Sequence, residues 1–339
     1  MSKNLKVLLV FDSPYFVPRG YDFKEEFKEE DWGTECQVYK ALCDIGYQVT
    51  MLGLYNDITI LFQEVKESKP DVVFNLAEVF TQKSHFDKNI AWLLEMLGIP
   101  YTGGTPASLL ICNNKAISKE ILSYHRIKVP RFHTFYRDHR IWLPKRLRLP
   151  LIIKPLCEEA SRGISQASVV DNEDAFNERV KFIHQSMNSD AIAEEYIEGR
   201  ELYVSILGNK RLKIFPLREM KFGGFGEDEP RVATYKAKWD YDYREKWEIK
   251  NVFAGRLAEG LDRTIEDICK RAYRVLNMSS YGRLDIRVSP EGQVYILEAN
   301  ANPCLEIDDE FAISAEKGGL PYKKLVRKLI KLAFDKEYI

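Results

Sequence analysis

Two carboxylates, an amide and an arginine lie close together in one apolar stretch of the chain. They are Arg283, Asp285, Glu298 and Asn300, and the turn residues 289–292 between them predict a β-hairpin. A short two-residue loop would place Arg283 opposite Glu298, with Asp285 diagonal to it and Asn300 further along the same strand. Such oxygen ligands suit Mg²⁺, which completes its shell with water and nucleotide phosphates. The hairpin therefore predicts a nucleotide–magnesium site, although a solvated sheet with cross-strand ion pairs would show the same residues.

The apolar residues of this stretch alternate with the polar ones, as they do in strands that bury one face. The second face of the hairpin should therefore pack against a core and leave the polar face free for a ligand. We expect the packed side chains to be Leu284, Ile286, Val288, Tyr295, Leu297 and Ala299.

The composition is that of a globular protein whose partners are small molecules. The chain has 339 residues, 45% hydrophobic and 30% charged, enough for several domains with cores of their own. Its 50 Lys and Arg balance 51 Asp and Glu, so no net charge favours nucleic acid or a membrane surface. The first apolar run, broken by Asp12, is too short for a signal peptide. Six cysteines without CxxC or zinc spacing favour free thiols and a cytoplasmic location.

Strand-like and helix-like patterns alternate in the first third of the chain, and this βαβα order predicts a parallel sheet wrapped by helices. A long loop, 12–31, follows the first strand, where such sheets place ligand contacts. No GxGxxG motif follows that strand, which disfavours a dinucleotide-binding Rossmann fold. The predicted strands are 6–10, 48–54 and 71–77, and the predicted helices are 34–45, 58–67, 86–97 and a packing helix at 322–332.

Two segments in the middle of the chain carry side chains suited to a nucleotide. Residues 149–165 read as a buried strand that ends at Lys154, followed by a turn of small residues with Ser161 and Gly163 that could face phosphate. A surface strand with a flexible loop would look much the same. Residues 191–208 read as a strand, a turn and a second strand. The acids in this second segment that could bind adenine and ribose are Glu194, Glu195 and Glu201.

The order of these segments resembles the ATP-grasp fold, and within it the D-alanine–D-alanine ligases. The resemblance runs through most of the chain, because residues 98–108 with Asn114 and Lys115 look like that family's passage into the ATP-grasp domain. It implies an α/β protein, α+β in the ATP-grasp part, with an N-terminal parallel-sheet domain and a two-subdomain ATP-grasp fold. The implied domains are residues 1–110, the central subdomain 111–196, and the C-terminal subdomain 197–339, which carries the metal site.

The resemblance also implies roles for individual residues. The family positions that contact ATP through its phosphates, adenine or ribose are matched by Lys115, Lys154, Ser161, Gly163, Glu194, Glu195, Ile197, Glu201 and Lys238. The positions implied in catalysis are matched by Arg283, Lys238 and Ser161. The magnesium ligands, for two ions that manganese could replace, are matched by Asp285, Glu298 and Asn300.

The activity that the resemblance implies is the ATP-dependent joining of a carboxylate to an amine. ATP first phosphorylates the carboxylate, and the amine then attacks the acyl phosphate and releases phosphate. Magnesium and the matched cations would stabilise the developing negative charge, while loop closure would keep water out. The implied partners are small-molecule carboxylate and amine substrates, amino acids or peptide-like compounds, with neither nucleic acid nor membrane. A homodimer is a further expectation, since relatives are often dimers.

The chain departs from the ligase pattern where the family binds its substrates. The family's Gly-Gly-rich first loop, with an acid for the ammonium of the first amino acid, is replaced by residues 11–19. Ala160 and Trp239 stand where the family usually has a serine and a tyrosine of a loop-locking network. Activity of the same class on other substrates is therefore the preferred interpretation. A genuine peptidoglycan D-alanine–D-alanine ligase and a non-catalytic ATP-binding module remain the alternatives.

Four acids lie where the family grips the carboxylate of the acceptor: Glu306, Asp308, Asp309 and Glu310. They would repel a carboxylate, which favours an acceptor whose far end is cationic or uncharged. A simpler explanation is that Asp308 or Asp309 caps a helix that begins near Glu310. The dipole at the N-terminus of that helix would stabilise the other acids. Both explanations can hold at once.

Overall fold

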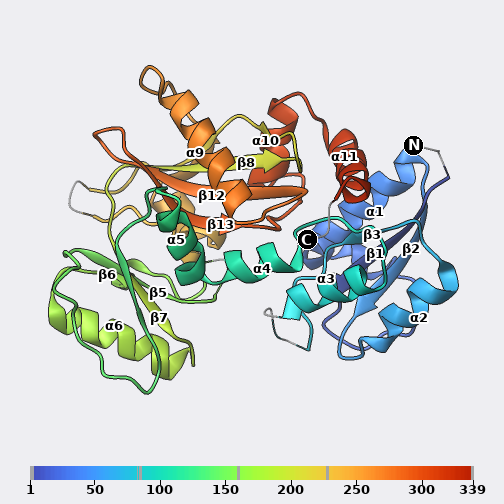
Figure 1. The fold of residues 1–339 in the computed structure, drawn as a ribbon, viewed down its shortest axis with the longest axis horizontal. Helices are drawn as coiled ribbons and strands as arrows, with labels where there is room; N and C mark the ends of the chain where they lie inside the picture. The colour runs from blue at the N-terminus through green and yellow to red at the C-terminus, as the bar shows by residue number, and fades with distance from the viewer. Residues whose placement is uncertain (1–3, 82, 84–85, 159–160, 227–228, 337–339) are drawn as a thin grey trace.

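A parallel sheet forms the N-terminal part of the chain in the computed structural model, which describes residues 4–81, 83, 86–158, 161–226 and 229–336 (Figure 1). The strand order is β2-β1-β3. Alternate β1 side chains are buried in two different cores, because helices cover both faces of the sheet. The βαβα prediction is thereby confirmed. The elements are β1 (Lys6–Asp12), α1 (Gly33–Ile45), β2 (Gln48–Leu54), α2 (Thr59–Ser68), β3 (Val72–Asn75) and α3 (Asp87–Met96).

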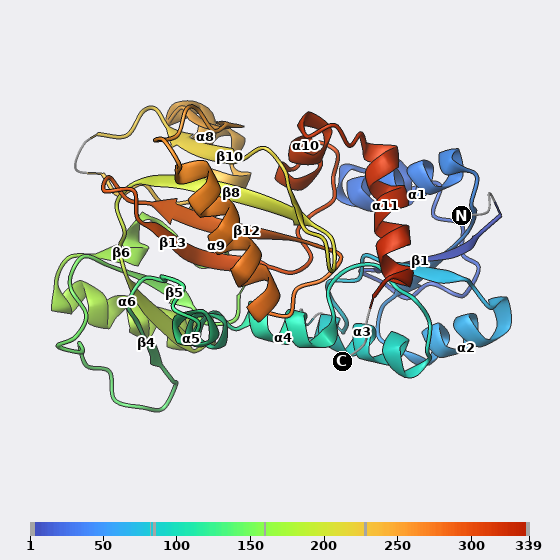
Figure 2. The ribbon, with the colours of Figure 1, turned by 45° about the horizontal axis from the view of Figure 1, so that its top comes forward.

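Two helices lead from this first domain to a small antiparallel sheet of order β4-β7-β5-β6. Figure 2 shows α4 running between the first domain and the rest of the molecule. The helix α6 covers one face of the small sheet, and its apolar side chains fill a separate core there. The elements are α4 (Pro106–Asn113), α5 (Lys115–Tyr124), β4 (Phe132–Phe135), β5 (Leu151–Pro155), β6 (Val169–Val170), α6 (Glu173–Ser186) and β7 (Ala191–Glu195).

A larger antiparallel sheet of order β11-β10-β8-β12-β13, with β9 beside β8, makes up the next part of the chain. The amphipathic helix α9 packs against it through Ile265, Cys269 and Ala272. The elements are β8 (Arg200–Leu207), β9 (Lys213–Ile214), β10 (Arg218–Phe222), α7 (Tyr235–Trp239), α8 (Tyr241–Lys246), β11 (Ile249–Phe253), α9 (Leu261–Val275), β12 (Tyr281–Val288), β13 (Val294–Asn300) and α10 (Glu310–Lys317).

The last helix, α11 (Tyr322–Phe334), returns to the first domain and lies beside α1 (Figures 1 and 2). Leu325, Val326, Leu329 and Ile330 are buried in the same core as one face of β1, as the helical pattern predicted. The two ends of the chain are therefore held together by one apolar core. No helix among the described residues is both long and apolar enough to cross a bilayer.

The hairpin of β12 and β13 differs in register from the predicted one. Asp285 lies directly opposite Glu298, and Arg283 lies opposite Asn300. The predicted pairing of Arg283 with Glu298 is therefore wrong. There are two reasons: the connection spans residues 289–293, which displaces β13 by one residue, and a β-bulge between Asp285 and Ile286 displaces it by one more.

A β-bulge in the same hairpin changes which side chains reach the core. The pairing shifts between Asp285 and Ile286, so that Leu297 has no direct partner on β12. Ile296 is buried in the core instead, and Leu297 lines a pocket on the polar face, contrary to prediction. Tyr295 is only partly buried. The other predicted core residues are buried as expected: Leu284, Ile286, Val288 and Ala299.

Candidate active site

A narrow pocket between the small sheet and the large sheet collects most of the residues assigned to ATP. Its volume is about 60 Å³, well below the roughly 300–1,000 Å³ of typical ligand pockets, so its walls must part before a nucleotide can enter. Lys115 and Gly163 do not line it. The predicted ATP-binding residues that do line it are Lys154, Ser161, Glu194, Glu195, Ile197, Glu201 and Lys238.

The Glu194 carboxylate is fully buried at the back of this pocket between two lysines. Lys154 Nζ lies 3.0 Å from Glu194 Oε2, and Lys119 Nζ lies 3.4 Å from Oε1. Burial raises the pKa of Glu194, but the charges of Lys119 and Lys154 outweigh it and the pKa is lowered. The sequence interpretation missed Lys119, although it follows Lys115 by one helical turn on α5, where both side chains share a face.

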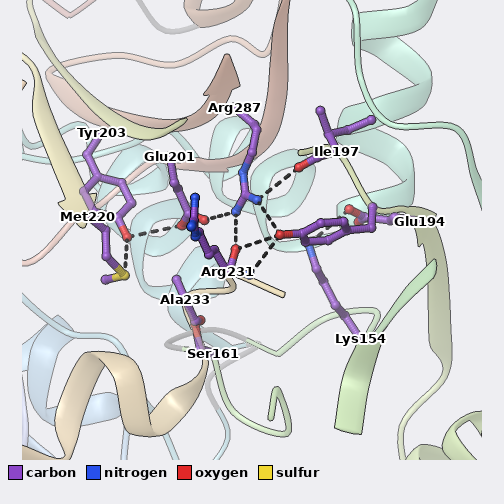
Figure 3. A network of polar contacts seen from close by, with 11 residues as sticks. Lys154, Ser161, Glu194, Ile197, Glu201, Tyr203, Met220, Arg231, Ala233 and Arg287 are labelled. Atoms are coloured by element: carbon purple, nitrogen blue, oxygen red, sulfur yellow. Dashed lines mark hydrogen bonds and ion pairs between the residues drawn. The ribbon is translucent and has the colours of Figure 1, made fainter. Parts of the chain in front are cut away.

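The carboxylate predicted to bind ribose, Glu201, is part of a buried network drawn in Figure 3. The guanidinium of Arg287 pairs with Glu201 and donates to the Ile197 carbonyl at 3.0 Å and to the Arg231 carbonyl at 3.0 Å. Tyr196 Oη accepts from the same guanidinium at 3.4 Å. Arg287 was not predicted. Its position could have been inferred from the sequence. Arg283, Asp285 and Arg287 occupy every second position of β12 and therefore share one face of the strand.

Glu298 stands at the centre of the site and is paired with Lys115. The α5 helix begins at Lys115 because the side chain of Asn114 accepts hydrogen bonds from its first turn. Lys115 Nζ then lies 3.1 Å from Glu298 Oε1. Burial raises the pKa of Glu298, yet the charges of Lys115, Lys238 and Lys154 lower it to about 2. Glu298 is therefore ionised at physiological pH, as a metal ligand must be.

The hairpin supplies a donor set that fits Mg²⁺. Asp285 and Glu298 are opposite in register, and Asn300 follows Glu298 by two residues on β13, so its side chain shares their face and can offer its amide oxygen. The guanidinium of Arg283 donates to both oxygens of Asp285, at 2.7 and 3.1 Å. No cluster of three His, Cys, Asp or Glu side chains suited to a metal occurs in the described part of the chain. An ion here would therefore complete its shell with water and phosphate.

The loop after β5 is tied to the segment that precedes α7. Ser161 Oγ donates to the Ala233 carbonyl at 2.9 Å, and Ser161 has a positive φ of 59°. Gly163 also has a positive φ, and a Cβ at this position would collide with Met187, so a glycine suits it. The predicted departure at Ala160 lies outside the described residues.

A second and larger cavity, about 730 Å³ in volume, lies between the hairpin and the first domain. Arg283, Glu298 and Asn300 line it from the hairpin, and Lys238 lines it from α7. Glu298 and Lys238 also line the narrow pocket. The two cavities thus meet at the polar face of the hairpin, and a group bound in one can reach a group bound in the other.

The acidic run after β13 divides into side chains with different surroundings. Asp309 caps α10 and accepts from the Glu310 N–H at 2.6 Å, which confirms the helix-cap explanation. Glu310 is neutralised by Arg218 at 2.8 Å and bonded by Asn251 at 2.6 Å. Asp308 is exposed. Capping and pairing therefore account for Asp309 and Glu310, whereas Glu306 faces the large cavity without an ion pair among the described residues.

The first domain contributes carboxylates to the large cavity that the sequence interpretation missed. Asp12 ends β1, Glu35 lies in the first turn of α1, and Glu78 follows β3. For Asp12 a signal existed, since ligand contacts gather at the carboxyl ends of parallel strands. For Glu35 there was none, because an acid in the first turn of a helix is expected on dipole grounds alone.

Comparisons with known proteins agree with this geometry. A family model described as the D-ala D-ala ligase C-terminus matches residues 121–331. The chain is 29% identical over 262 residues to the uncharacterized protein y4sG of Sinorhizobium fredii, covering 77% of this chain and 74% of that protein. It is 28% identical over 303 residues to the D-alanine–D-alanine ligase of Thermotoga maritima, covering 89% and 91%. The D-alanine–D-alanine ligase of Bacillus anthracis complexed with ATP has the same fold, with a TM-score of 0.74 at 21% identity over 98% of each chain.

Proposed function

The chain belongs to the D-alanine–D-alanine ligase family of ATP-dependent carboxylate–amine ligases, and we propose that it joins its substrates through an acyl phosphate formed at the β12–β13 hairpin. The observation that carries this proposal is that Glu298 and Lys238 line both cavities. A nucleotide in the narrow pocket would present its terminal phosphate at the place where a carboxylate in the large cavity ends. Such placement makes the phosphoryl transfer between two bound substrates effectively unimolecular, which lowers its entropic cost.

The cations of the site take part by changing partners. Lys115 and Lys154 are each paired with a carboxylate here, and in this proposal both would contact phosphates when a nucleotide enters. Magnesium bound by Asp285, Glu298 and Asn300 would supply charge neutralisation on the phosphates. Arg283, once released from Asp285, would donate to the carboxylate as it becomes an acyl phosphate. Lys238 would face the same oxygens from α7.

Ser161, Gly163 and the network around Glu201 position the nucleotide in this proposal. The link from Ser161 to the Ala233 carbonyl holds the phosphate-covering loop to the segment that carries Lys238. Glu194 and the backbone groups of Glu195 and Ile197 would contact the adenine ring. Glu201 would accept hydrogen bonds from the ribose hydroxyls while it keeps part of its contact with Arg287. Family membership further supports magnesium, a cytoplasmic location and a homodimer as parts of the same proposal.

Peptidoglycan D-alanine–D-alanine ligase activity is the second candidate, because several relatives carry that name. The uncompensated acid Glu306 beside the acceptor region speaks against it, since a free amino acid presents a carboxylate there. Phosphate release from ATP, measured with pairs of amino acids and amines, separates the candidates. Release that depends on an added amine supports a ligase, and efficient release with D-alanine alone identifies the peptidoglycan activity. Nucleotide binding without release under any pair would leave only a non-catalytic module.

A further inference from the structure

Three carboxylates without counter-ions face each other on the first-domain side of the large cavity. They are Asp12 from β1, Glu35 from α1 and Glu306 from the loop before α10. None of them forms an ion pair among the described residues. Glu306 lies directly against the start of α1, because a Cβ placed on Gly33 would collide with Glu306 Oε1. The folded chain therefore brings three like charges together from segments far apart in sequence.

The surroundings of these carboxylates do not neutralise them. The Asp12 carboxylate accepts from the N–H groups of Glu78 and Val79, at 2.9 and 3.3 Å. The N-terminal dipole of α1 favours an anion, but it amounts to about half a charge against three carboxylates. Burial, with the charges of Asp12 and Glu306 adding to it, raises the pKa of Glu35 to about 7. The arrangement is costly for the folded chain by itself, and a cation would relieve that cost.

A tyrosine on the wall of the same cavity offers independent evidence for a ligand. Tyr281, on β12, is 3% exposed and lines the cavity, yet its hydroxyl has no hydrogen-bond partner among the described residues. The Tyr322 hydroxyl, close enough to Glu35 and Glu306 to feel their charges, is buried and also lacks a partner. Buried polar groups are nearly always hydrogen-bonded in folded proteins. The Tyr281 hydroxyl, which belongs to the cavity lining, is therefore available to a bound group.

The basic residues that line the cavity, Lys238, Arg244 and Arg283, all come from the ATP-grasp part of the chain. Acids also line this part, but Glu298 is paired with Lys115 and Glu310 with Arg218. A ligand that spans the cavity thus has cations within reach at its reacting end and unpaired carboxylates at its far end. At about 730 Å³ the cavity is within the usual range for ligand sites, and a long side chain fits it better than a methyl group.

We propose that Asp12, Glu35 and Glu306 form a subsite for the cationic end, an ammonium or guanidinium, of a basic substrate whose other end reacts beside Arg283 and Glu298. This inference rests on the proposed ligase function for the reaction itself, but the subsite can be tested by binding alone. A basic amino acid of lysine or arginine type has the required shape, since its carboxylate and its side-chain cation lie at opposite ends. A diamine would use the same subsite as an acceptor.

Titration calorimetry at pH 8, with and without a non-hydrolysable ATP analogue and Mg²⁺, tests the subsite. Lysine and arginine should bind more tightly than norleucine, a neutral amino acid of similar length. Glu35→Gln and Glu306→Gln should each weaken lysine binding about tenfold and leave norleucine binding unchanged. Tyr281→Phe should weaken lysine binding less, because an uncharged hydroxyl attracts a cation less strongly than a carboxylate does. Glu30→Gln removes an exposed acid near the same helix and should change nothing.

Several outcomes would overturn the subsite. Equal affinity for lysine and norleucine, or lysine affinity unchanged in both Glu35→Gln and Glu306→Gln, would show that the carboxylates do not hold a cation. Circular dichroism of each variant confirms that its fold is intact. Phosphate release with neutral substrates but not with basic ones would support the ligase function and contradict the cation subsite. Tight lysine binding that depends on Glu35, without phosphate release for any substrate pair, would support the subsite and contradict the ligase function.

Discussion

Asp285 lies opposite Glu298 across β12 and β13, and each of these carboxylates is held by its own cation, Arg283 and Lys115 respectively. Two adjacent carboxylates repel unless positive charge lies between them. In this structure side chains provide that charge, and a magnesium–nucleotide complex would replace them. In the proposed mechanism this replacement would free Arg283 and Lys115 to face the phosphates and the carboxylate, and would couple metal binding to assembly of the catalytic groups.

Glu298→Gln tests this metal site. The amide keeps the size of the side chain and one oxygen, but it removes the charge that a hard divalent ion requires, so ATP turnover should fall about 100-fold or more. The fold should survive, as judged by circular dichroism. Glu291→Gln, at the exposed turn of the same hairpin, should leave turnover unchanged. Near-wild-type turnover in Glu298→Gln would show that the hairpin is only a structural ion-pair network.

Variants at Glu201 and Lys154 separate ribose binding from chemistry. Glu201→Gln should raise the KM for ATP with little change in kcat, because ribose is remote from the reacting phosphorus, whereas Lys154→Ala should also lower kcat. Steady-state kinetics measure both parameters. Equal changes in both variants would contradict the assigned roles.

Removing the Glu201 carboxylate altogether should have a separate cost in stability. The Arg287–Glu201 pair is buried on both sides, with 4% and 7% of the side chains exposed. Glu201→Ala leaves the Arg287 guanidinium buried without its counter-charge, so we expect a loss of about 3–5 kcal/mol in the free energy of unfolding. Urea denaturation measures this loss. Glu291→Ala, where the carboxylate is exposed, should cost less than about 0.5 kcal/mol.

Glu35→Gln should stabilise the protein in a pH-dependent way. The pKa of Glu35 is about 7 in the folded chain, above its ordinary value of 4.5, so the folded state holds the proton more tightly than the unfolded state. Ionisation therefore costs stability as the pH rises from 4.5 through 7, and the cost is complete above 7. We expect Glu35→Gln to gain about 1–2 kcal/mol at pH 8, allowing for partial exposure, and little at pH 4.5. Thermal unfolding at both pH values measures it, and an equal shift at both would contradict the burial of this acid.

Asp309→Asn probes the acceptor side of the site. Asparagine caps helices as well as aspartate does, so α10 and the stability should be nearly unchanged, whereas Asp309→Ala should cost about 1 kcal/mol. If the charge of Asp309 selects the acceptor, Asp309→Asn should reduce the difference in phosphate release between basic or neutral amines and free D-alanine. ATP binding should remain. Phosphate release with matched amines measures this preference. A wild-type protein that makes D-alanyl-D-alanine efficiently and shows no such preference would contradict the prediction.

The sequence by itself determined the secondary-structure elements and the kinds of side chains in the candidate nucleotide site. The periods of the apolar residues are local properties, so they predicted the parallel sheet, the packing face of α11 and the polar face of the hairpin. The alternation of Arg283, Asp285 and Arg287 on β12 follows from the strand geometry in the same way.

The tertiary structure decided the partners of these groups. The register of the hairpin depends on a bulge and a turn length that alternation does not encode, and for that reason Asp285 rather than Arg283 faces Glu298. The assembly of Asp12, Glu35 and Glu306 depends on how the segment after β13 crosses to the first domain. Side chains so far apart in sequence meet only through long-range packing, and no local pattern records which charges that packing brings together.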